Sequence, residues 1–343
     1  MARRRRVVLA LAGLVLASAA GLVGLDFFRF AHSPMAPNHA SSITLEIQPG
    51  TPVAAVARRL AQDGLIDRPL YFRLLARVTG AARRIKAGEY VVDPDTTPYH
   101  LLRKFVAGDV KTYSITIVEG WTFAEMMKAI RSNDVIRHTL RGKSSAQIMA
   151  ALGHPDQKAE GRFFPDTYQF TRGTPDTEIL QRAYKRMHEV LMQAWSKRDD
   201  DLPFDSPYDA LILASIIERE TAVPSERARI AGVFVERLER GMRLQTDPTV
   251  IYGLGDQYHG DLRLEDLRKD TPYNTYTRKG LPPTPIALPS QASIHAAVHP
   301  ERRGELYFVA TGNGHHVFSK TLKQHNKAVI KYQLGGDASR LRK

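Results

Sequence analysis

The hydrophobic positions at the start of the chain form one unbroken run. Residues 7–25 read VVLALAGLVLASAAGLVGL, nineteen residues without a charge. As a helix, this run would span about 28 Å at about 1.5 Å per residue, which is just enough to cross the hydrocarbon core of a bilayer. The pattern therefore predicts a transmembrane helix at residues 7–25, preceded by a short tail at residues 1–6.

The charges beside this run predict its orientation. Residues 3–6 are arginines, and basic residues stay on the cytoplasmic side, so the chain after Leu25 would lie outside the cytoplasm. The small residues ASA at 17–19 also resemble a signal-peptide cleavage site. We favour a retained anchor, because the apolar run continues past that site and the aromatic cluster at residues 27–30 suits a membrane interface.

We assign residues 26–42 to a linker. Residues 31–42, which make up most of it, contain two prolines and show no apolar periodicity, and periodic patterns resume after them. ITLEI at 43–47 alternates like a strand, and the following VAAVARRLAQDG has its apolar residues at helical spacing. A second helix at about 69–79 and a strand-like GEYVV complete the pattern. We expect residues 43–112 to form a small β-α-α-β unit, whose layout resembles a LysM-like carbohydrate-binding module.

Residues 113–333 predict a larger mixed domain. Residues 113–132 are typical of a strand followed by a helix, residues 175–198 of an amphipathic helix, and residues 209–221 of a strongly apolar helix. The strand-turn-helix at 113–132 is similar to the one at the start of the small unit. An internal duplication explains this similarity no better than the fact that strand-turn-helix units are common in proteins. The expected fold class is α+β, with the anchor, the small unit, the larger domain and a basic tail at 334–343.

Composition removes several classes of function. The chain has 343 residues, a net charge of +13 and no cysteine. The lack of cysteine excludes disulfides, thiolate nucleophiles and cysteine-based zinc sites, and it agrees with an extracytoplasmic location because nothing is left to oxidise. The positive charge suits nucleic acid, an anionic membrane or an acidic polymer. No zinc-finger spacing, RNA-binding strand signature or Walker loop accompanies the charge, so we do not expect nucleic acid as a partner.

One aromatic-rich segment has the composition of a sugar site. In EGRFFPDTYQF, residues 160–170, the polar groups Glu160, Asp166 and Tyr168 alternate with phenylalanines. Aromatic faces stack on pyranose rings while carboxylates accept hydrogen bonds from hydroxyls. The alternative is a turn whose aromatic side chains fill the core.

Two glutamates end the apolar helix predicted at 209–221. At about 100° per residue, Glu220 falls on the face of Leu213, Ile216 and Ile217, whereas Glu218 lies about 160° away. Desolvation on the more apolar face and the negative end of the helix dipole both raise the pKa of a carboxyl group. Such a group can donate a proton near neutral pH, so Glu220 is the better candidate for a general acid. The alternative is that both glutamates are solvated at a fraying helix end.

Three long motifs carry a family resemblance. The run ASIIERETAVPSERARIAGVFVERLERGMRLQTDPTVIYGLG from residue 214 is followed by TPYNTYTRKGLPPTPIALP and LYFVATGNGHHVFSKTLKQHN. In this order they closely resemble the YceG-like family, from about residue 43 to residue 333. The resemblance implies a single-pass protein of the bacterial inner membrane with a periplasmic C-terminal domain and a LysM-like subdomain. It implies an endolytic lytic transglycosylase that cuts nascent peptidoglycan and so terminates glycan elongation, and the E-x-E-T motif places its catalytic glutamate at Glu220.

The implied reaction is a lyase-type cleavage that needs one carboxyl group. The C6 hydroxyl of N-acetylmuramic acid attacks C1 in place of water, which breaks the β-1,4 bond to N-acetylglucosamine and leaves a 1,6-anhydro end. Glu220 would protonate the leaving oxygen and then accept the hydroxyl proton. No metal and no organic cofactor are implied. The partners are peptidoglycan strands, the inner membrane and peptidoglycan synthases of the penicillin-binding type.

Polar residues in the same motifs are expected to hold the sugar. Asp247, followed by Pro248, is also a good helix N-cap with proline at the first helical position. Residues 273–277 combine ring faces with amide and hydroxyl groups in a loop that prolines make rigid. His315 and His316 lack a second, suitably spaced ligand pair, so we expect a turn near a strand there and no metal. The expected substrate-binding residues are Glu218, Gln245, Thr246, Asp247, Tyr273, Asn274, Tyr276, Thr277, Glu160, Asp166 and Tyr168.

Two other classes of function remain open from the sequence. A membrane-anchored protein could bind peptidoglycan through the small unit without catalysis, and a dispensable, exposed Glu220 would favour it. An anchored protein could instead recruit nucleic acid through its charge, and strongly salt-dependent DNA binding would favour that.

Overall fold

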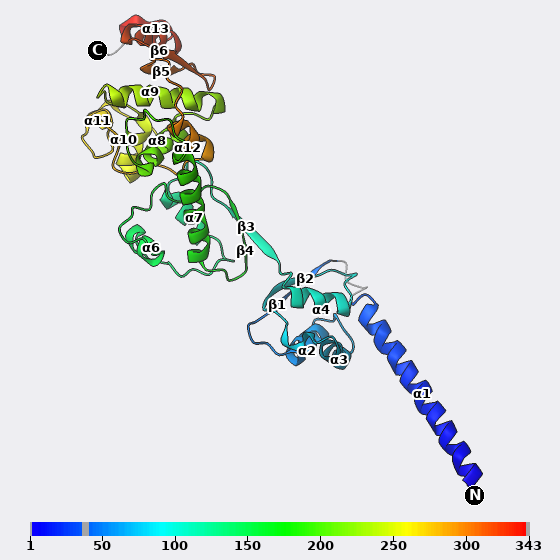
Figure 1. Cartoon of the computed structure of the whole chain (residues 1–343). Coiled ribbons are helices and arrows are strands. Elements are labelled where there is room, and N and C mark those ends of the chain that lie inside the picture. Colours follow the sequence, from blue (N-terminus) through cyan, green and yellow to red (C-terminus); the bar gives the residue numbers. More distant parts are fainter. Residues whose placement is uncertain (1, 36–40, 341–343) are drawn as a thin grey trace. The chain divides into compact units, whose positions relative to one another are not determined.

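The structure is a computed structural model that describes residues 2–35 and 41–340 (Figure 1). Residues 36–40 of the expected linker and residues 341–343 of the expected tail lie outside the described residues. The chain divides into two compact units. The small unit comprises Met1–Tyr113 and Phe170–Gly173, and the large unit comprises Ser114–Gln169 and Thr174–Lys343.

The first element is one long apolar helix, α1 (Ala2–His32). It is long and apolar enough to cross a membrane, by length and composition, and none of its most hydrophobic stretch is buried inside the protein. The helix continues past Leu25 to His32, so the first part of the expected linker is helical. Phe27 and Phe30 pack edge-on against the ring of Tyr71, and these contacts hold the last two turns of α1 on the small unit.

The rest of the small unit has the β-α-α-β order expected from the sequence, with one further helix. Strands β1 and β2 pair antiparallel, with Leu45 opposite Tyr90. One side of each helix packs into a single core around Phe72, Tyr90 and Phe105. The elements are β1 (Ile43–Ile47), α2 (Val53–Gln62), α3 (Pro69–Val78), the 3-10 turn η1 (Ala81–Arg83), β2 (Gly88–Val92) and α4 (Pro98–Ala107).

The remaining elements make the chain a mixed helix-and-strand protein, as expected. Strand β3 pairs with β4, and β5 pairs antiparallel with β6. The strands are β3 (Thr112–Thr116), β4 (Thr167–Thr171), β5 (Tyr307–Ala310) and β6 (His316–Ser319). The helices are α5 (Phe123–Arg131), α6 (Ser145–Ala151), α7 (Asp176–Trp195), α8 (Pro207–Glu220), α9 (Arg227–Glu239), α10 (Asp247–Leu254), α11 (Leu264–Arg268), α12 (Gln291–Val298) and α13 (Leu322–Tyr332).

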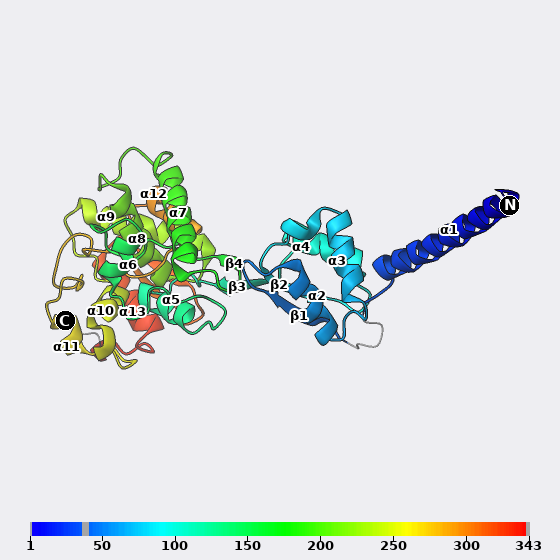
Figure 2. The ribbon, with the colours of Figure 1, turned by 90° about the horizontal axis from the view of Figure 1, so that it is seen from below.

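Helix α8 forms the centre of the large unit. Every residue from Ala210 to Ile217 is buried, and α7, α9, α10 and α12 all contact this helix (Figures 1 and 2). A helix that is hydrophobic on all sides must lie inside a core. Its polar last turn, which carries Glu218 and Glu220, therefore emerges from that core at a defined place.

Candidate active site

A cleft of about 510 Å³ opens at the C-terminal end of α8. Glu220, the last residue of α8, lines it together with Thr246, Asp247 and Tyr276. Further lining comes from Arg237 on α9, from Leu244 and Gln245 before α10, from the strands β5 and β6, and from α13. The fold thus brings the end of the apolar helix together with segments that lie up to about a hundred residues later in the chain.

The carboxyl group of Glu220 is held by one hydrogen bond within this cleft. The hydroxyl of Thr246, a buried residue, donates to Glu220 Oε1. Burial raises the pKa of Glu220 to about 7; the Thr246 bond and the charge of Arg237 lower it, and the charge of Asp247 raises it. A carboxyl group that titrates near pH 7 can both give and take a proton at neutral pH.

Thr246 is fixed by its own backbone contacts. Its N–H donates to Thr275 Oγ1 at 3.0 Å, and its carbonyl accepts from Thr249 Oγ1 at 2.8 Å. Thr246 is the N-cap residue of α10, but its hydroxyl makes no cap bond and points to Glu220 instead. The preceding Gln245 has a φ of 52°, in the left-handed region that non-glycine residues rarely adopt. Such strain is maintained only where the surrounding structure fixes it, and here it lies next to the candidate acid.

A second carboxylate lies in the same cleft. Asp247 accepts a hydrogen bond of 2.5 Å from the hydroxyl of Tyr276. Burial, followed by this bond to Asp247, raises the pKa of the Tyr276 hydroxyl, so that it stays a donor. Asp247 is the first residue of α10 and not its N-cap, which corrects the capping alternative by one position. Gln245, Thr246, Asp247 and Tyr276 are thus brought to Glu220 as expected.

Arg237 joins two segments that line the cleft. Its buried guanidinium donates from Nε to the carbonyl of Leu306 at 2.6 Å and from a terminal nitrogen to that of Leu244 at 2.7 Å. Burial lowers the pKa of Arg237, and its carbonyl partners fix it in place. No pattern in the run VERLERG separates this arginine from a surface charge, so the sequence alone does not point to it.

The residues that β5, β6 and α13 contribute to the cleft were not expected from the sequence either. Tyr307, His316, His325 and Asn326 line the cleft, and the ring of His325 stacks on that of Tyr307 at 5.2 Å. Burial lowers the pKa of His325, which favours its neutral form. Their motif, LYFVATGNGHHVFSKTLKQHN, could have pointed to them, since it is one of the three that carry the family resemblance.

The histidine pair does not form a metal site with the side chains around it in the described part of the chain. His316 begins β6 and His315 precedes it, as expected for a turn near a strand, and both rings contact Glu226, at 2.7 and 3.1 Å. Across the described residues, no group of three or more histidine and carboxylate side chains could hold a metal ion.

Glu218 has a different role from Glu220. Its Oε2 accepts from the N–H and the hydroxyl of Ser290, at 2.8 and 2.5 Å, and Arg227 lies 3.8 Å from its other oxygen. Ser290 is the N-cap of α12, so Glu218 secures the start of that helix and is not among the residues that line the cleft. Its side chain is only 6% exposed, so Glu218 is desolvated as well, although it lies on the other face of the helix. The partners of the two carboxyl groups distinguish them, and neither lies at a solvated, fraying end.

Three more of the expected substrate-binding residues lie outside the cleft lining. Asn274 is buried; its amide nitrogen donates to three backbone carbonyls, and its oxygen accepts from the N–H of Tyr276. Tyr273 bonds to Thr284, and Thr277 bonds to Asp270. Asn274 therefore shapes the loop that presents Tyr276 to the cleft.

The aromatic-rich segment packs into the interior. Tyr168 is buried and donates to the carbonyl of Phe164, whose ring is also buried, while Asp166 is exposed at the start of β4. Glu160 is buried and accepts from the N–H of Phe123 at 2.8 Å and the hydroxyl of Tyr252 at 3.0 Å. Burial raises the pKa of Glu160 to about 7. The aromatic side chains fill the core, so the expected sugar platform is not present on this segment.

The fold and the cleft define a class of protein: a mixed helix-and-strand chain with a helix able to span a membrane, and a partly buried acid in a polar cleft. Residues 45–331 match the YceG-like family, and the chain belongs to that family.

Named relatives agree with this assignment. The endolytic murein transglycosylase of Bacillus subtilis strain 168 is 32% identical over 327 residues, with 87% of each chain covered. That of Streptococcus pneumoniae strain D39 is 26% identical, with 93% of this chain and 63% of its own length covered. A crystal structure of a YceG-like protein from Listeria monocytogenes has a TM-score of 0.52 and 31% identity, covering 83% of this chain and 98% of the other.

Proposed function

We propose that this chain is an endolytic murein transglycosylase, an enzyme of the lyase class that acts on peptidoglycan. Its family and the activity named for its relatives support this. The single observation that carries the proposal is Glu220, a carboxyl group with a pKa near 7 in a polar cleft.

Glu220 acts first as an acid and then as a base. It protonates the bridging oxygen of the β-1,4 bond between N-acetylmuramic acid and N-acetylglucosamine while the bond from C1 to that oxygen breaks. The C6 hydroxyl of the muramic acid residue forms the new bond to C1, and its proton returns to Glu220. The products are a 1,6-anhydromuramic end and a free hydroxyl on the other sugar, and no water is consumed.

The neighbouring groups support this sequence of steps. The Thr246 hydroxyl holds Glu220 Oε1 and stabilises its ionised form, which is needed in the second step. Asp247, oriented by Tyr276, supplies a negative charge in the same cleft for the oxocarbenium-like transition state. Gln245 is exposed beside them and can bond sugar hydroxyls or amides.

The location of the enzyme follows from the same proposal. Helix α1 anchors it in the bacterial inner membrane, the arginines at residues 3–6 stay in the cytoplasm, and the rest of the chain is periplasmic. There it cuts nascent strands and terminates their elongation, in the vicinity of penicillin-binding synthases. The small unit serves as a LysM-like module that holds the glycan.

A second candidate is a hydrolytic glycosidase, because Asp247 supplies the second carboxylate that such enzymes use. A glycosidase that uses water leaves reducing ends and not anhydro ends. A third, non-catalytic candidate is a peptidoglycan-binding protein, which leaves the strands intact.

The products of purified peptidoglycan strands separate these candidates. Detergent-solubilised full-length protein is incubated with the strands as wild type, Glu220→Gln and Glu218→Gln, and the fragments are analysed by mass spectrometry. We expect internal cuts with anhydro ends from the wild type and from Glu218→Gln, and no cuts from Glu220→Gln. Reducing ends would favour the glycosidase, and intact strands from the wild type would favour the binding protein. Thermal unfolding of each variant shows whether it remains folded.

A further inference from the structure

Helix α3 in the small unit has a second apolar face that points away from the core. Leu70, Leu74 and Val78 recur at every fourth position, with exposed fractions of 69%, 46% and 69%. The opposite face is buried and consists of Phe72, Leu75 and Ala76. Among the described residues outside α1, no other helix exposes three large hydrophobic side chains. Contiguous exposed apolar side chains of this kind mark a contact surface.

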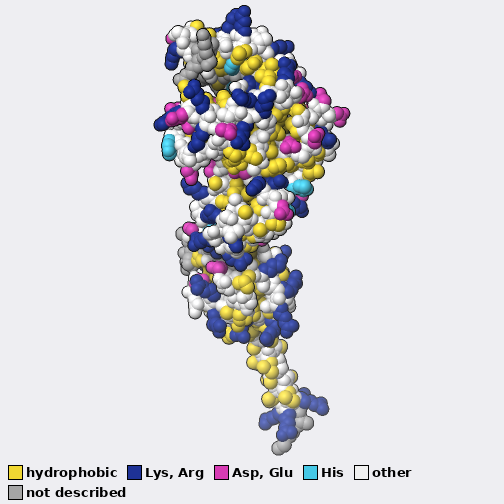
Figure 3. Space-filling view, turned by 90° about the vertical axis from the view of Figure 1, so that its left-hand side faces the viewer, with side chains coloured by type: hydrophobic (Ala, Val, Ile, Leu, Met, Phe, Trp, Pro, Cys, Tyr) yellow, Lys and Arg dark blue, Asp and Glu magenta, His cyan; other side chains and the backbone are white. Residues whose placement is uncertain are grey.

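The surroundings of this face are strongly basic. Residues 69–88 contain four arginines and one lysine and no carboxylate. Arg73 and Arg77 lie next to the apolar stripe on α3, both are exposed, and neither forms an ion pair within the described parts of the chain. Lysine and arginine side chains crowd the small unit close to α1, with apolar surface between them (Figure 3). Basic and apolar side chains on one helix face are typical of binding to an anionic membrane surface.

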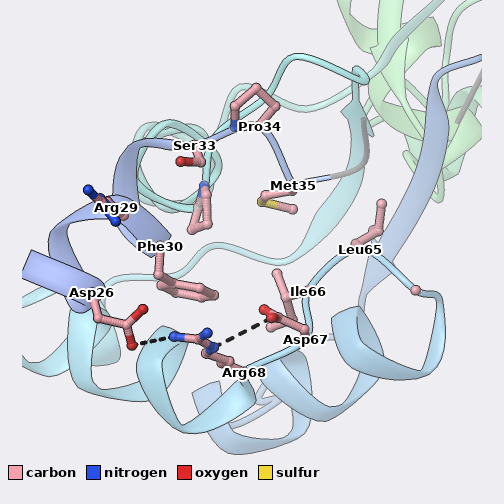
Figure 4. A pocket seen from close by; sticks show the side chains of 12 residues that line it. Asp26, Arg29, Phe30, Ser33, Pro34, Met35, Leu65, Ile66, Asp67 and Arg68 are labelled. Carbon is pink, nitrogen blue, oxygen red and sulfur yellow. Dashed lines mark hydrogen bonds and ion pairs between the residues drawn. The ribbon is translucent and has the colours of Figure 1, made fainter. Parts of the chain in front are cut away.

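The start of α3 is attached to the end of α1. Arg68 donates to Asp26 (Figure 4). The hydroxyl of Tyr71 also donates to Asp26, at 3.1 Å. The rings of Phe27 and Phe30 each lie 5.6 Å from that of Tyr71. These contacts fix the first turn of α3 beside residues 26–30, and Asp26, Phe30 and Arg68 also line a pocket of about 380 Å³.

This attachment sets the level of α3 relative to the bilayer. Residues 26–30 directly follow the apolar run 7–25, so they lie in the headgroup layer when that run spans the membrane. Tyr99 on α4, which contacts His32 at the end of α1, is exposed at the same junction. Tyrosine is one of the two residue types that concentrate at membrane interfaces.

We propose that the exposed face of α3 binds the surface of the anionic phospholipid bilayer from which α1 emerges. The apolar side chains of Leu70, Leu74 and Val78 enter the interfacial layer, and Arg73 and Arg77 contact lipid phosphates. The bilayer is the occupant that the structure favours, because α1 already holds this face at the headgroup level and the adjacent charge is positive. The inference rests on the proposed role of α1 as an anchor.

The absence of cysteine makes a labelling test direct. Full-length protein is reconstituted in nanodiscs with a fluorophore on a single cysteine, at Leu74→Cys, at Leu16→Cys in α1, or at Glu46→Cys on β1. Quenching by lipids with a nitroxide at headgroup or acyl depth is measured while phosphatidylglycerol replaces phosphatidylcholine. The Leu74 label is tested again with Arg73→Gln/Arg77→Gln, and with the matched pair Arg141→Gln/Lys197→Gln on the large unit.

We expect the Leu74 label to be quenched at headgroup depth in anionic discs, and the Glu46 label to remain unquenched. Removing Arg73 and Arg77 should weaken docking about twenty-five-fold, at about fivefold for each arginine near an anionic surface, and the matched pair should leave it unchanged. A Leu74 label no more quenched than the Glu46 label, with the Leu16 label quenched at acyl depth, would overturn the docking and leave the anchor intact. An unquenched Leu16 label would overturn both. If the Leu74 label is shielded from solvent only when two copies share one disc, the face binds a second copy of the chain and not the bilayer.

Discussion

The bond from Thr246 to Glu220 gives the sharpest test of the proposed acid. Valine has nearly the shape of threonine, so Thr246→Val removes the hydroxyl that donates to Glu220 Oε1 and little else. Because this bond favours the ionised carboxyl group, its loss should raise the pKa of Glu220 above about 7.

The size of the shift follows from the strength of such bonds. A hydrogen bond to a charged group is worth about 1.5–3 kcal/mol, and one pKa unit corresponds to about 1.4 kcal/mol. Glu220 is only partly buried, so water in the cleft can replace part of the lost bond and the lower limit applies. We therefore expect the pKa to rise by about one unit. The ratio of variant to wild-type activity should then increase about eightfold between pH 6 and pH 9.

The assay is the pH dependence of kcat/KM for anhydro-product formation, which reports the ionisation of the free enzyme. Thr284→Val is the matched control, because Thr284 is a buried threonine of the large unit that donates to the Pro285 carbonyl and is not among the residues that line the cleft. This control should lower stability without shifting the alkaline limb of the pH profile of kcat/KM. An alkaline limb that stays in place or moves to lower pH in Thr246→Val would refute the assignment of Glu220 as the acid.

Two further predictions concern stability, measured by urea unfolding. The pKa of Glu160 is raised from 4.5 to about 7 in the folded state, so its stabilisation is complete below pH 4.5 and is lost as the pH rises through 7. Glu160→Gln should remove up to about 3 kcal/mol of that pH-dependent change, and an unaltered slope between pH 4.5 and 7 would contradict the burial of an acid there. Arg237→Lys loses a planar group that donates to backbone carbonyls on two segments, and should cost about 2–4 kcal/mol. The same change at the exposed Arg240, Arg240→Lys, should cost under about 0.5 kcal/mol. Equal losses of unfolding free energy in the two variants would show that the planar guanidinium of Arg237 is not needed.

Local patterns in the sequence were sufficient for several of the elements and for the position of the candidate acid. The uninterrupted run at 7–25 predicts α1. The core of a small unit is not large enough to bury a helix that is apolar on all sides over nineteen residues. The helical spacing in the small unit predicts α2 and α3, since one face of each must pack on the sheet. Glu220 follows the apolar run directly, so its place at the end of α8 could be predicted from neighbouring residues alone.

Composition was not sufficient for the aromatic segment at 160–170. Phenylalanine and tyrosine suit a sugar platform and a core equally well, and only their neighbours in space decide between the two. In the structure Phe164 and Tyr168 are covered by other parts of the chain, so the segment supports the fold.

Local sequence patterns were enough to predict a helix long and apolar enough to span a membrane, a β-α-α-β unit and a helix that ends in two glutamates, because each depends mainly on residues close together in the chain. The tertiary structure was needed to show which side chains surround each glutamate. Ser290, seventy-two residues after Glu218, engages that carboxylate to start α12, while Thr246, twenty-six residues after Glu220, leaves that carboxyl group protonatable in a cleft. The pKa of a carboxyl group depends on the donors, charges and water around it, and these come from segments whose meeting no local periodicity records.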